Sequence, residues 1–184
     1  MPSTKQNALV ETDCAWLHDA EPSAYIASAG ITGDTKKTYP SGEGEMSLTV
    51  DQIRLVTESY ELIRLSPRPY SEIFYYRLLL DYPFARALFP DDMANQVAVF
   101  SNTIDALVFN IADIAKLGPF LSDLGRKHGK YGVKTYQYEA VGNVLINTFA
   151  AILGERFTPA TRQAWEAVYG ETAGIMISAS YSQI

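Results

Sequence analysis

The sequence predicts an all-α fold, and three observations support this prediction. Every clear periodic segment from Ser47 onwards has helical spacing, beginning with Ile53, Val56 and Tyr60. These segments are bordered by capping residues or prolines, which are the usual boundaries of helices. The chain has 184 residues, of which 47% are hydrophobic, and this is enough to bury one well-packed core.

The composition changes near residue 46, and this change divides the chain into two parts. Residues 1–46 form an acidic extension that contains Gly, Ser and Pro, with three lysines against seven acidic residues. Residues 47–184 form the helical domain. A short helix is expected over Thr12–Ala20. Whether the extension docks through Trp16 or has no fixed structure stays open.

The helical domain is expected to contain six main helices. The first begins at Ser47 or Thr49 and ends at Ser66-Pro67, and the second stops before Pro83, because a residue that precedes proline avoids helical geometry. The expected elements after the first are the second helix from about Pro67, a short turn over Phe84–Leu88, a long helix from about Met93 to Lys116, a helix that carries His128, and helices over about Thr135–Leu153 and Pro159–Tyr181.

Charge and hydropathy exclude several functions. The formal net charge is −6 and no segment clusters Lys or Arg, so we expect no nucleic-acid partner. Val97–Ala115 is the most apolar stretch, but polar residues interrupt it, so we expect no membrane span. The N-terminus lacks the apolar run of a secretory signal, which favours a cytoplasmic protein. Cys14 is the only cysteine, so it has no partner for an internal disulfide or a thiolate metal site.

His128 is the residue with the most specific chemistry. It follows Leu121 and Leu124 by seven and four residues, which places it on the apolar face of its expected helix. Such a histidine can be a core residue bonded to a carbonyl, or it can present a neutral imidazole to haem iron. The second histidine, His18, lies in the acidic extension and is expected to be exposed to solvent.

Ser47 to Tyr181 resembles a globin of the three-over-three type, in particular bacterial single-domain haemoglobins and the globin domain of flavohaemoglobins. The resemblance lies in the order of the helices, the short turn after the second one and several motifs. Ser71-Glu72-Ile73-Phe74-Tyr75-Tyr76-Arg77 is similar to the second helix of that family, and Trp165, Tyr169 and Gly170 are similar to its last helix. Lys127-His128 and Tyr131-Gly132, followed by Tyr138 and Leu145, are similar to its proximal region.

The resemblance implies a haem b cofactor and a set of site residues. His128 would be the proximal iron ligand, and the distal pocket would contain Tyr75, Gln96 and Phe100. Gln96 precedes His128 by 32 residues, which fits the family without a gap. The implied haem contacts are Phe89, Lys127, Val133, Tyr138, Val141 and Leu145, and Lys127 and Arg126 are candidates to pair with the haem propionates.

The chemistry of these residue types favours the binding of a diatomic gas. Ferrous haem needs one nitrogen ligand and an open position, and donors from Tyr75 and Gln96 would each stabilise O₂ by roughly 1 to 3 kcal/mol. Flavohaemoglobins keep an acidic residue beside the proximal imidazole, but the matching position here is Ser180. This departure favours reversible binding over O–O cleavage and peroxidase-like turnover.

Three functional classes follow from the resemblance. The first is reversible binding of O₂, together with NO or CO, for oxygen binding, storage, transport or sensing. The second is an NO dioxygenase, which would need electrons from an external reductase because no flavin or nicotinamide domain is recognised in these residues. The third is a signalling module, either a haem-based gas sensor or a haem-free globin. A homodimer stays open, as do the O₂ affinity and the role of residues 1–46.

Overall fold

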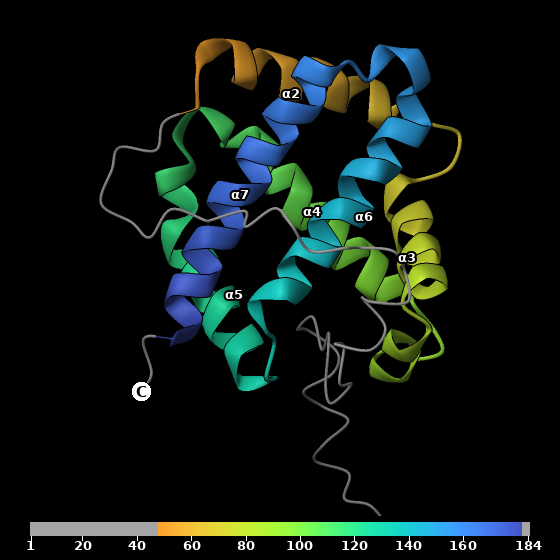
Figure 1. Ribbon diagram of the computed structural model, residues 1–184, viewed down its shortest axis with the longest axis vertical. Coiled ribbons are helices and arrows are strands. Elements are labelled where there is room, and N and C mark those ends of the chain that lie inside the picture. Colours follow the sequence, from red (N-terminus) through yellow and green to blue (C-terminus); the bar gives the residue numbers. More distant parts are fainter. Residues whose placement is uncertain (1–47, 182–184) are drawn as a thin grey trace, which may run out of the picture.

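The computed structural model describes residues 48–181, and this part of the chain is helical and contains no strand (Figure 1). Its six α-helices are α2 (Val50–Arg64), α3 (Tyr70–Asp81), α4 (Ala94–Phe109), α5 (Gly118–Lys130), α6 (Thr135–Leu153) and α7 (Pro159–Tyr181). Three short 3₁₀ helices, η2 (Pro83–Leu88), η3 (Ile111–Leu117) and η4 (Gly154–Arg156), connect them. The predicted all-α class is confirmed.

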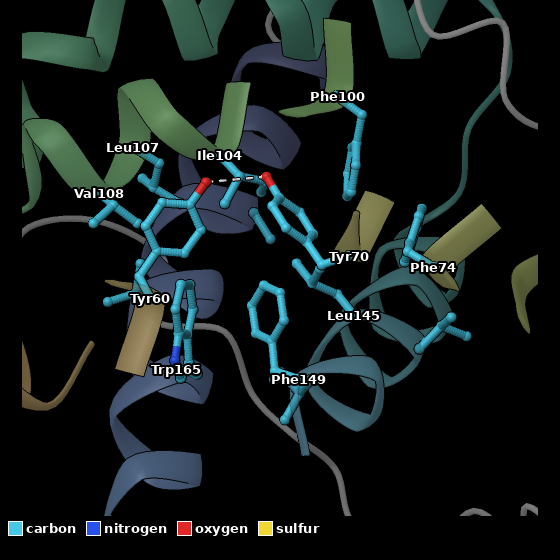
Figure 2. Packing of buried hydrophobic residues seen from close by; sticks show 14 of the residues in the cluster. Tyr60, Tyr70, Phe74, Phe100, Ile104, Leu107, Val108, Leu145, Phe149 and Trp165 are labelled. Atoms are coloured by element: carbon cyan, nitrogen blue, oxygen red, sulfur yellow. Dashed lines mark hydrogen bonds between the residues drawn. The ribbon is translucent and has the colours of Figure 1, made fainter. Parts of the chain in front are cut away.

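The helices form a three-over-three sandwich. The α2 helix packs on α6 and α7, which also contact each other, α3 packs on α4 and α6, and α5 packs on α7. Figure 1 shows α7 crossing in front of α5, and the contact between these two helices is the most extensive in the fold. The core between the layers is rich in aromatic rings, among them Tyr60, Phe149 and Trp165 (Figure 2).

Side-chain caps explain the helix starts that the sequence predicts best. Thr49 precedes α2, and its Oγ1 accepts a hydrogen bond from the Gln52 backbone N–H at 3.2 Å, while Gln52 Oε1 accepts one from the Thr49 N–H at 2.8 Å. This reciprocal pair satisfies two backbone donors at the helix start. The side chain of Thr158 caps α7, because its Oγ1 accepts a hydrogen bond from the Thr161 N–H at 3.1 Å.

The second helix starts later than the sequence predicts. It begins at Tyr70 rather than near Pro67, and Pro69 occupies the N-cap position. Proline disfavours helical geometry in the residue before it, so Arg68 cannot join the helix easily. Of the prolines at 67 and 69, the second therefore sets the boundary.

The predicted long helix from Met93 to Lys116 is wrong, because the chain breaks at Asn110. The α4 helix ends at Phe109, and the Asn110 side-chain amide donates to the Ala106 carbonyl at 2.9 Å, which competes with helix continuation. Asp113 has φ −150° and ψ 70°, which is not helical. The segment Ile111–Lys130 consequently leaves at a bend of 116° to α4.

Within the described residues, no single helix is long and apolar enough to cross a membrane. One helix pair, α4 with Ile111–Lys130, meets the criteria of length and composition only when the two are joined across their bend.

Candidate functional site

An apolar cavity lies between α4, α5, α6 and α7. It contains about 970 Å³ of space not filled by atoms, which is an upper measure because solvent at its mouth is included. Leucine, isoleucine, valine and aromatic side chains make up most of its wall. His128 is the residue of this wall with a side chain able to ligate a metal through nitrogen.

The imidazole of His128 is buried and held by its own helix. Its Nδ1 atom lies 2.8 Å from the carbonyl oxygen of Leu124, one turn earlier in α5. A carbonyl only accepts, so Nδ1 carries the ring proton and the lone pair of the neutral imidazole is on Nε2. This arrangement fixes the tautomer in the way that second-sphere partners of metal-ligating histidines do.

Close backbone packing fixes the position of the helix that carries His128. Gly125 lies against α7 so tightly that an added Cβ would be 2.2 Å from the Met176 carbonyl oxygen. One turn later, a Cβ on Gly129 would lie 3.0 Å from the Ser180 Cβ. The two glycines flank His128, so α7 determines how far its imidazole stands from the opposite wall.

Tyr75 of α3 and Gln96 of α4 contact each other. Gln96 Nε2 donates a hydrogen bond to Tyr75 Oη at 2.9 Å, and both side chains are buried. The Tyr75 ring packs edge to face with Phe89 and Phe100, each at a centroid distance of 5.6 Å. In this bond the Tyr75 oxygen is the acceptor, and a phenol hydroxyl can donate as well as accept.

Phe100 links this pair to the cavity. It lines the cavity wall, stacks on Phe74 at 4.4 Å and contacts the Tyr75 ring, whereas Tyr75, Gln96 and Phe89 do not line the cavity. The turn that carries Phe89 is held by Arg86, whose guanidinium donates to the Phe89 and Pro90 carbonyl oxygens at 3.0 and 2.9 Å. The structure thus brings these residues into contact with one another, and their role as a distal pocket stays a prediction.

The remaining expected contacts divide into two groups. Val133, Tyr138, Val141 and Leu145 line the cavity, and the Tyr138 ring is 5.8 Å from that of His128. Gly132, just before Val133, has φ 77°, a conformation that glycine adopts without strain, and this turn brings Val133 under His128. Lys127 and Arg126 do not line the cavity, and each lies within 3.6 Å of Asp123.

Ser180 lies on the α7 side of the imidazole helix, against Gly129. Its hydroxyl donates to the Ile177 carbonyl at 2.7 Å. His128 Nδ1 contacts the neutral Leu124 carbonyl. An imidazole bonded to a neutral acceptor is a weaker electron donor than one bonded to a carboxylate.

Several cavity residues escape the sequence argument. Trp165, Thr103 and Gln137 line the wall, although their positions in the sequence give no sign of this role. Gln137 looks like a helix-start residue, and it does accept a bond from the Lys134 N–H at 2.7 Å. Cys14, Trp16 and His18 lie outside the described residues.

Family membership and fold agree with this geometry. The globin family model matches residues 72–176, so the chain belongs to the globin family. A bacterial globin from Campylobacter jejuni has a similar fold, with a TM-score of 0.62 and 24% identity over 72% of this chain and 96% of that one. The flavohemoglobin of Malassezia yamatoensis, solved with bound FAD and heme, matches with a TM-score of 0.58 and 19% identity over 73% of this chain and 37% of that one.

Two characterised relatives show similarity over shorter segments. The flavohemoprotein of Bacillus subtilis (strain 168) is 31% identical over 107 residues, which are 56% of this chain and 27% of that protein. The neuroglobin of Dissostichus mawsoni is 40% identical over 73 residues, which are 40% of this chain and 46% of that protein. The matched segments thus span about a quarter and just under half of these relatives.

Proposed function

We propose that residues 47–184 form a haem-binding globin domain that binds O₂ reversibly at a haem b iron, with NO and CO as further ligands. The observation that carries this proposal is the buried His128 imidazole, which lines a large apolar cavity with its Nδ1 proton held by the Leu124 carbonyl. A largely apolar cofactor suits such a wall, and a neutral imidazole suits an iron.

When bound, haem would supply an iron centre with a position open to a diatomic gas. His128 would hold the iron through Nε2, and the α5–α7 contact at Gly125 would keep the imidazole in place. Val133, Val141 and Leu145 would exclude water from the macrocycle and so slow oxidation of the iron. Tyr138 would orient the imidazole from its flank.

Tyr75 and Gln96 would select the gas. A bound O₂ takes on negative charge, so the Tyr75 O–H would donate to it directly, and Gln96 would hold the tyrosine in position through its 2.9 Å bond. Carbon monoxide takes on much less charge and would gain less from the same donor. Phe100 lines the cavity and contacts the Tyr75 ring, so its position would influence how closely the hydroxyl approaches the gas.

A second candidate is NO dioxygenation, which converts NO and O₂ to nitrate with one electron for each turnover. The similarity to the flavohemoprotein of Bacillus subtilis favours it. An external reductase would supply the electron to this chain. The neutral partner of His128 favours reversible binding as the first candidate.

An O₂ titration of the ferrous protein tests the two candidates together. Reversible binding predicts that the oxygenated spectrum returns to the ferrous one when O₂ is removed, with no protein oxidised. For NO dioxygenation, addition of NO to the oxygenated protein yields one equivalent of nitrate, and turnover continues only when a reductase is added. A protein that oxidises within one cycle of loading and unloading contradicts the first candidate.

A further inference from the structure

Two buried, hydrogen-bonded tyrosines lie outside the proposed haem site. The hydroxyl groups of Tyr60 in α2 and Tyr70 in α3 are 3.1 Å apart (Figure 2). Tyr60 Oη also donates to Asp105 Oδ1 at 2.8 Å. Both tyrosines are almost fully buried, whereas Asp105 is exposed at the surface of α4. Tyr60 therefore connects the interior of the fold to a carboxylate in contact with solvent.

Trp165 lies next to both Tyr60 and the cavity. Its indole lines the cavity wall and its ring centroid is 6.1 Å from that of Tyr60. Indole and phenol are oxidised by loss of one electron more easily than aliphatic side chains, and 6.1 Å is close enough for rapid electron transfer between them. In the described part of the chain these rings make a continuous route from the cavity to Asp105.

The hydrogen bonds of Trp165 and Tyr60 differ, and the difference favours electron transfer from Tyr60 to an oxidised Trp165. Trp165 Nε1 donates to the Ser59 hydroxyl at 3.0 Å, and that hydroxyl itself donates to the Leu55 carbonyl at 2.6 Å. A hydroxyl is a poor base, so an oxidised Trp165 would keep its proton and stay strongly oxidising. Tyr60, in contrast, has a carboxylate ready to accept its proton.

Burial also keeps Tyr60 protonated. Burial, with the bond to Tyr70 and the charge of Asp105, raises the pKa of the Tyr60 hydroxyl far above its ordinary value. Tyr60 can therefore lose an electron readily only if its proton leaves with it. The 2.8 Å bond to Asp105 allows the proton to move to the carboxylate while the electron moves to Trp165.

We propose that Trp165 and Tyr60 form an electron-transfer route that removes oxidising equivalents from the cavity, with Asp105 as the proton acceptor. The first step takes one electron from Trp165 to give its radical cation. In the second, Tyr60 returns an electron to Trp165 and its proton to Asp105, which leaves a phenoxyl radical and a neutral carboxylic acid. The radical then regains an electron from a small phenol or thiol in solution, which loses its own proton to solvent, and Asp105 returns its proton to the Tyr60 oxygen.

The physiological source of the oxidising equivalents rests on the proposed haem function. Hydrogen peroxide reacting in the cavity takes up two electrons and two protons and becomes two molecules of water. Two passages along the route supply the two electrons, solvent supplies the two protons, and two donor molecules are consumed for each peroxide. The neutral partner of His128 predicts that such events are infrequent, which makes the route protective rather than catalytic.

Photoionisation of Trp165 tests the route without any haem chemistry. In the full chain with Trp16→Phe, Trp165 is the only indole. A laser pulse removes its electron, and transient absorption then follows the indole radical and the phenoxyl radical. We expect the phenoxyl signal to rise as the indole signal decays. Because light makes the radical, the result does not depend on whether the chain binds haem.

Two variants and one control identify the residues. Tyr60→Phe should remove the fast phenoxyl phase, and Asp105→Asn, which keeps an acceptor oxygen but cannot take a proton, should slow it about tenfold or more. Tyr76→Phe changes an exposed tyrosine of α3 and should leave both signals unchanged. A phenoxyl yield that is the same in Tyr60→Phe, or a rate that is the same in Asp105→Asn, would overturn the proposal. Circular dichroism spectra that match that of the parent protein show that the variants are folded.

Discussion

The Nδ1 atom of His128 lies 2.8 Å from the Leu124 carbonyl oxygen, so one turn of α5 determines which nitrogen of the imidazole faces away from its own helix. The bond needs no side chain from another element. Any residue at position 124 supplies the carbonyl, and the orientation of the imidazole therefore follows from the helix itself and from its contact with α7.

Replacement of His128 should separate haem binding from folding. His128→Gly removes the imidazole, so we expect loss of haem during gel filtration and recovery when free imidazole is added, because the small ligand can occupy the space that the side chain leaves. Lys130→Ala, in the exposed last turn of the same helix, is the control and should retain haem. Haem that stays bound to His128→Gly with a histidine-type spectrum would refute the ligand assignment.

Replacement of Tyr75 should speed the release of O₂. Tyr75→Phe removes the donor but keeps the ring between Phe89 and Phe100, and we expect O₂ to leave roughly ten to a hundred times faster, which corresponds to about 1 to 3 kcal/mol. Stopped-flow displacement of O₂ by CO measures the rate. Tyr76→Phe, at the adjacent exposed position, should release O₂ at the parent rate.

Gln96 should have a smaller effect than Tyr75. Its amide donates to the tyrosine oxygen, so Gln96→Leu leaves the donor in place but less firmly held. We expect O₂ release to accelerate by less than in Tyr75→Phe in the same stopped-flow experiment. If Gln96→Leu has the larger effect, the glutamine rather than the tyrosine contacts the gas.

A methyl group at Gly125 should destabilise the fold. Gly125→Ala would place its Cβ 2.2 Å from the Met176 carbonyl oxygen, and separating α5 from α7 should lower the free energy of unfolding by about 3 kcal/mol. Gly118→Ala is the matched control, because a Cβ there meets nothing within 4 Å, and it should be neutral or stabilising by up to about 1 kcal/mol. Urea unfolding followed by circular dichroism compares the two. Equal unfolding midpoints would contradict the packing account.

The buried tyrosines should make stability fall at alkaline pH. Burial raises the pKa of Tyr70 from 10.0 to about 12, so between these values the unfolded chain has released a proton that the folded chain keeps. The unfolded state then binds fewer protons, and the free energy of unfolding decreases as pH rises. Tyr70→Phe should reduce the loss of stability between pH 9 and 11 by about 1 kcal/mol, whereas Tyr76→Phe should not change it.

The sequence predicts those parts of the fold whose causes are local. The bounds of α6 and α7 agree with the prediction because Gly154 and the pair Thr158-Pro159 mark the boundaries between them. The break at Asn110 was not predictable from periodicity, since Ile111 and Ile114 continue the apolar pattern and are buried in the structure. A hydrophobic pattern shows which side chains are buried, but not whether one helix or two bury them.

The candidate site also contains some features that the sequence predicts and others that it does not. The place of His128 on a buried face follows from its spacing to Leu121, and Tyr75 and Gln96 come together as the family resemblance implies. The close approach of Gly125 to Met176 joins residues far apart in the sequence, so no local pattern shows it. The same holds for Trp165, whose ring reaches both the cavity and Tyr60.

The ultraviolet and visible spectrum of the purified protein tests the central claim most directly. It is recorded for the ferric protein, after reduction, and after exposure of the reduced protein to O₂. We expect a Soret band in all three states, a histidine-ligated ferrous spectrum and an oxygenated form that persists and reverts when O₂ is removed. A protein that shows no Soret band even after addition of haem would contradict the account and leave His128 as a residue of the core.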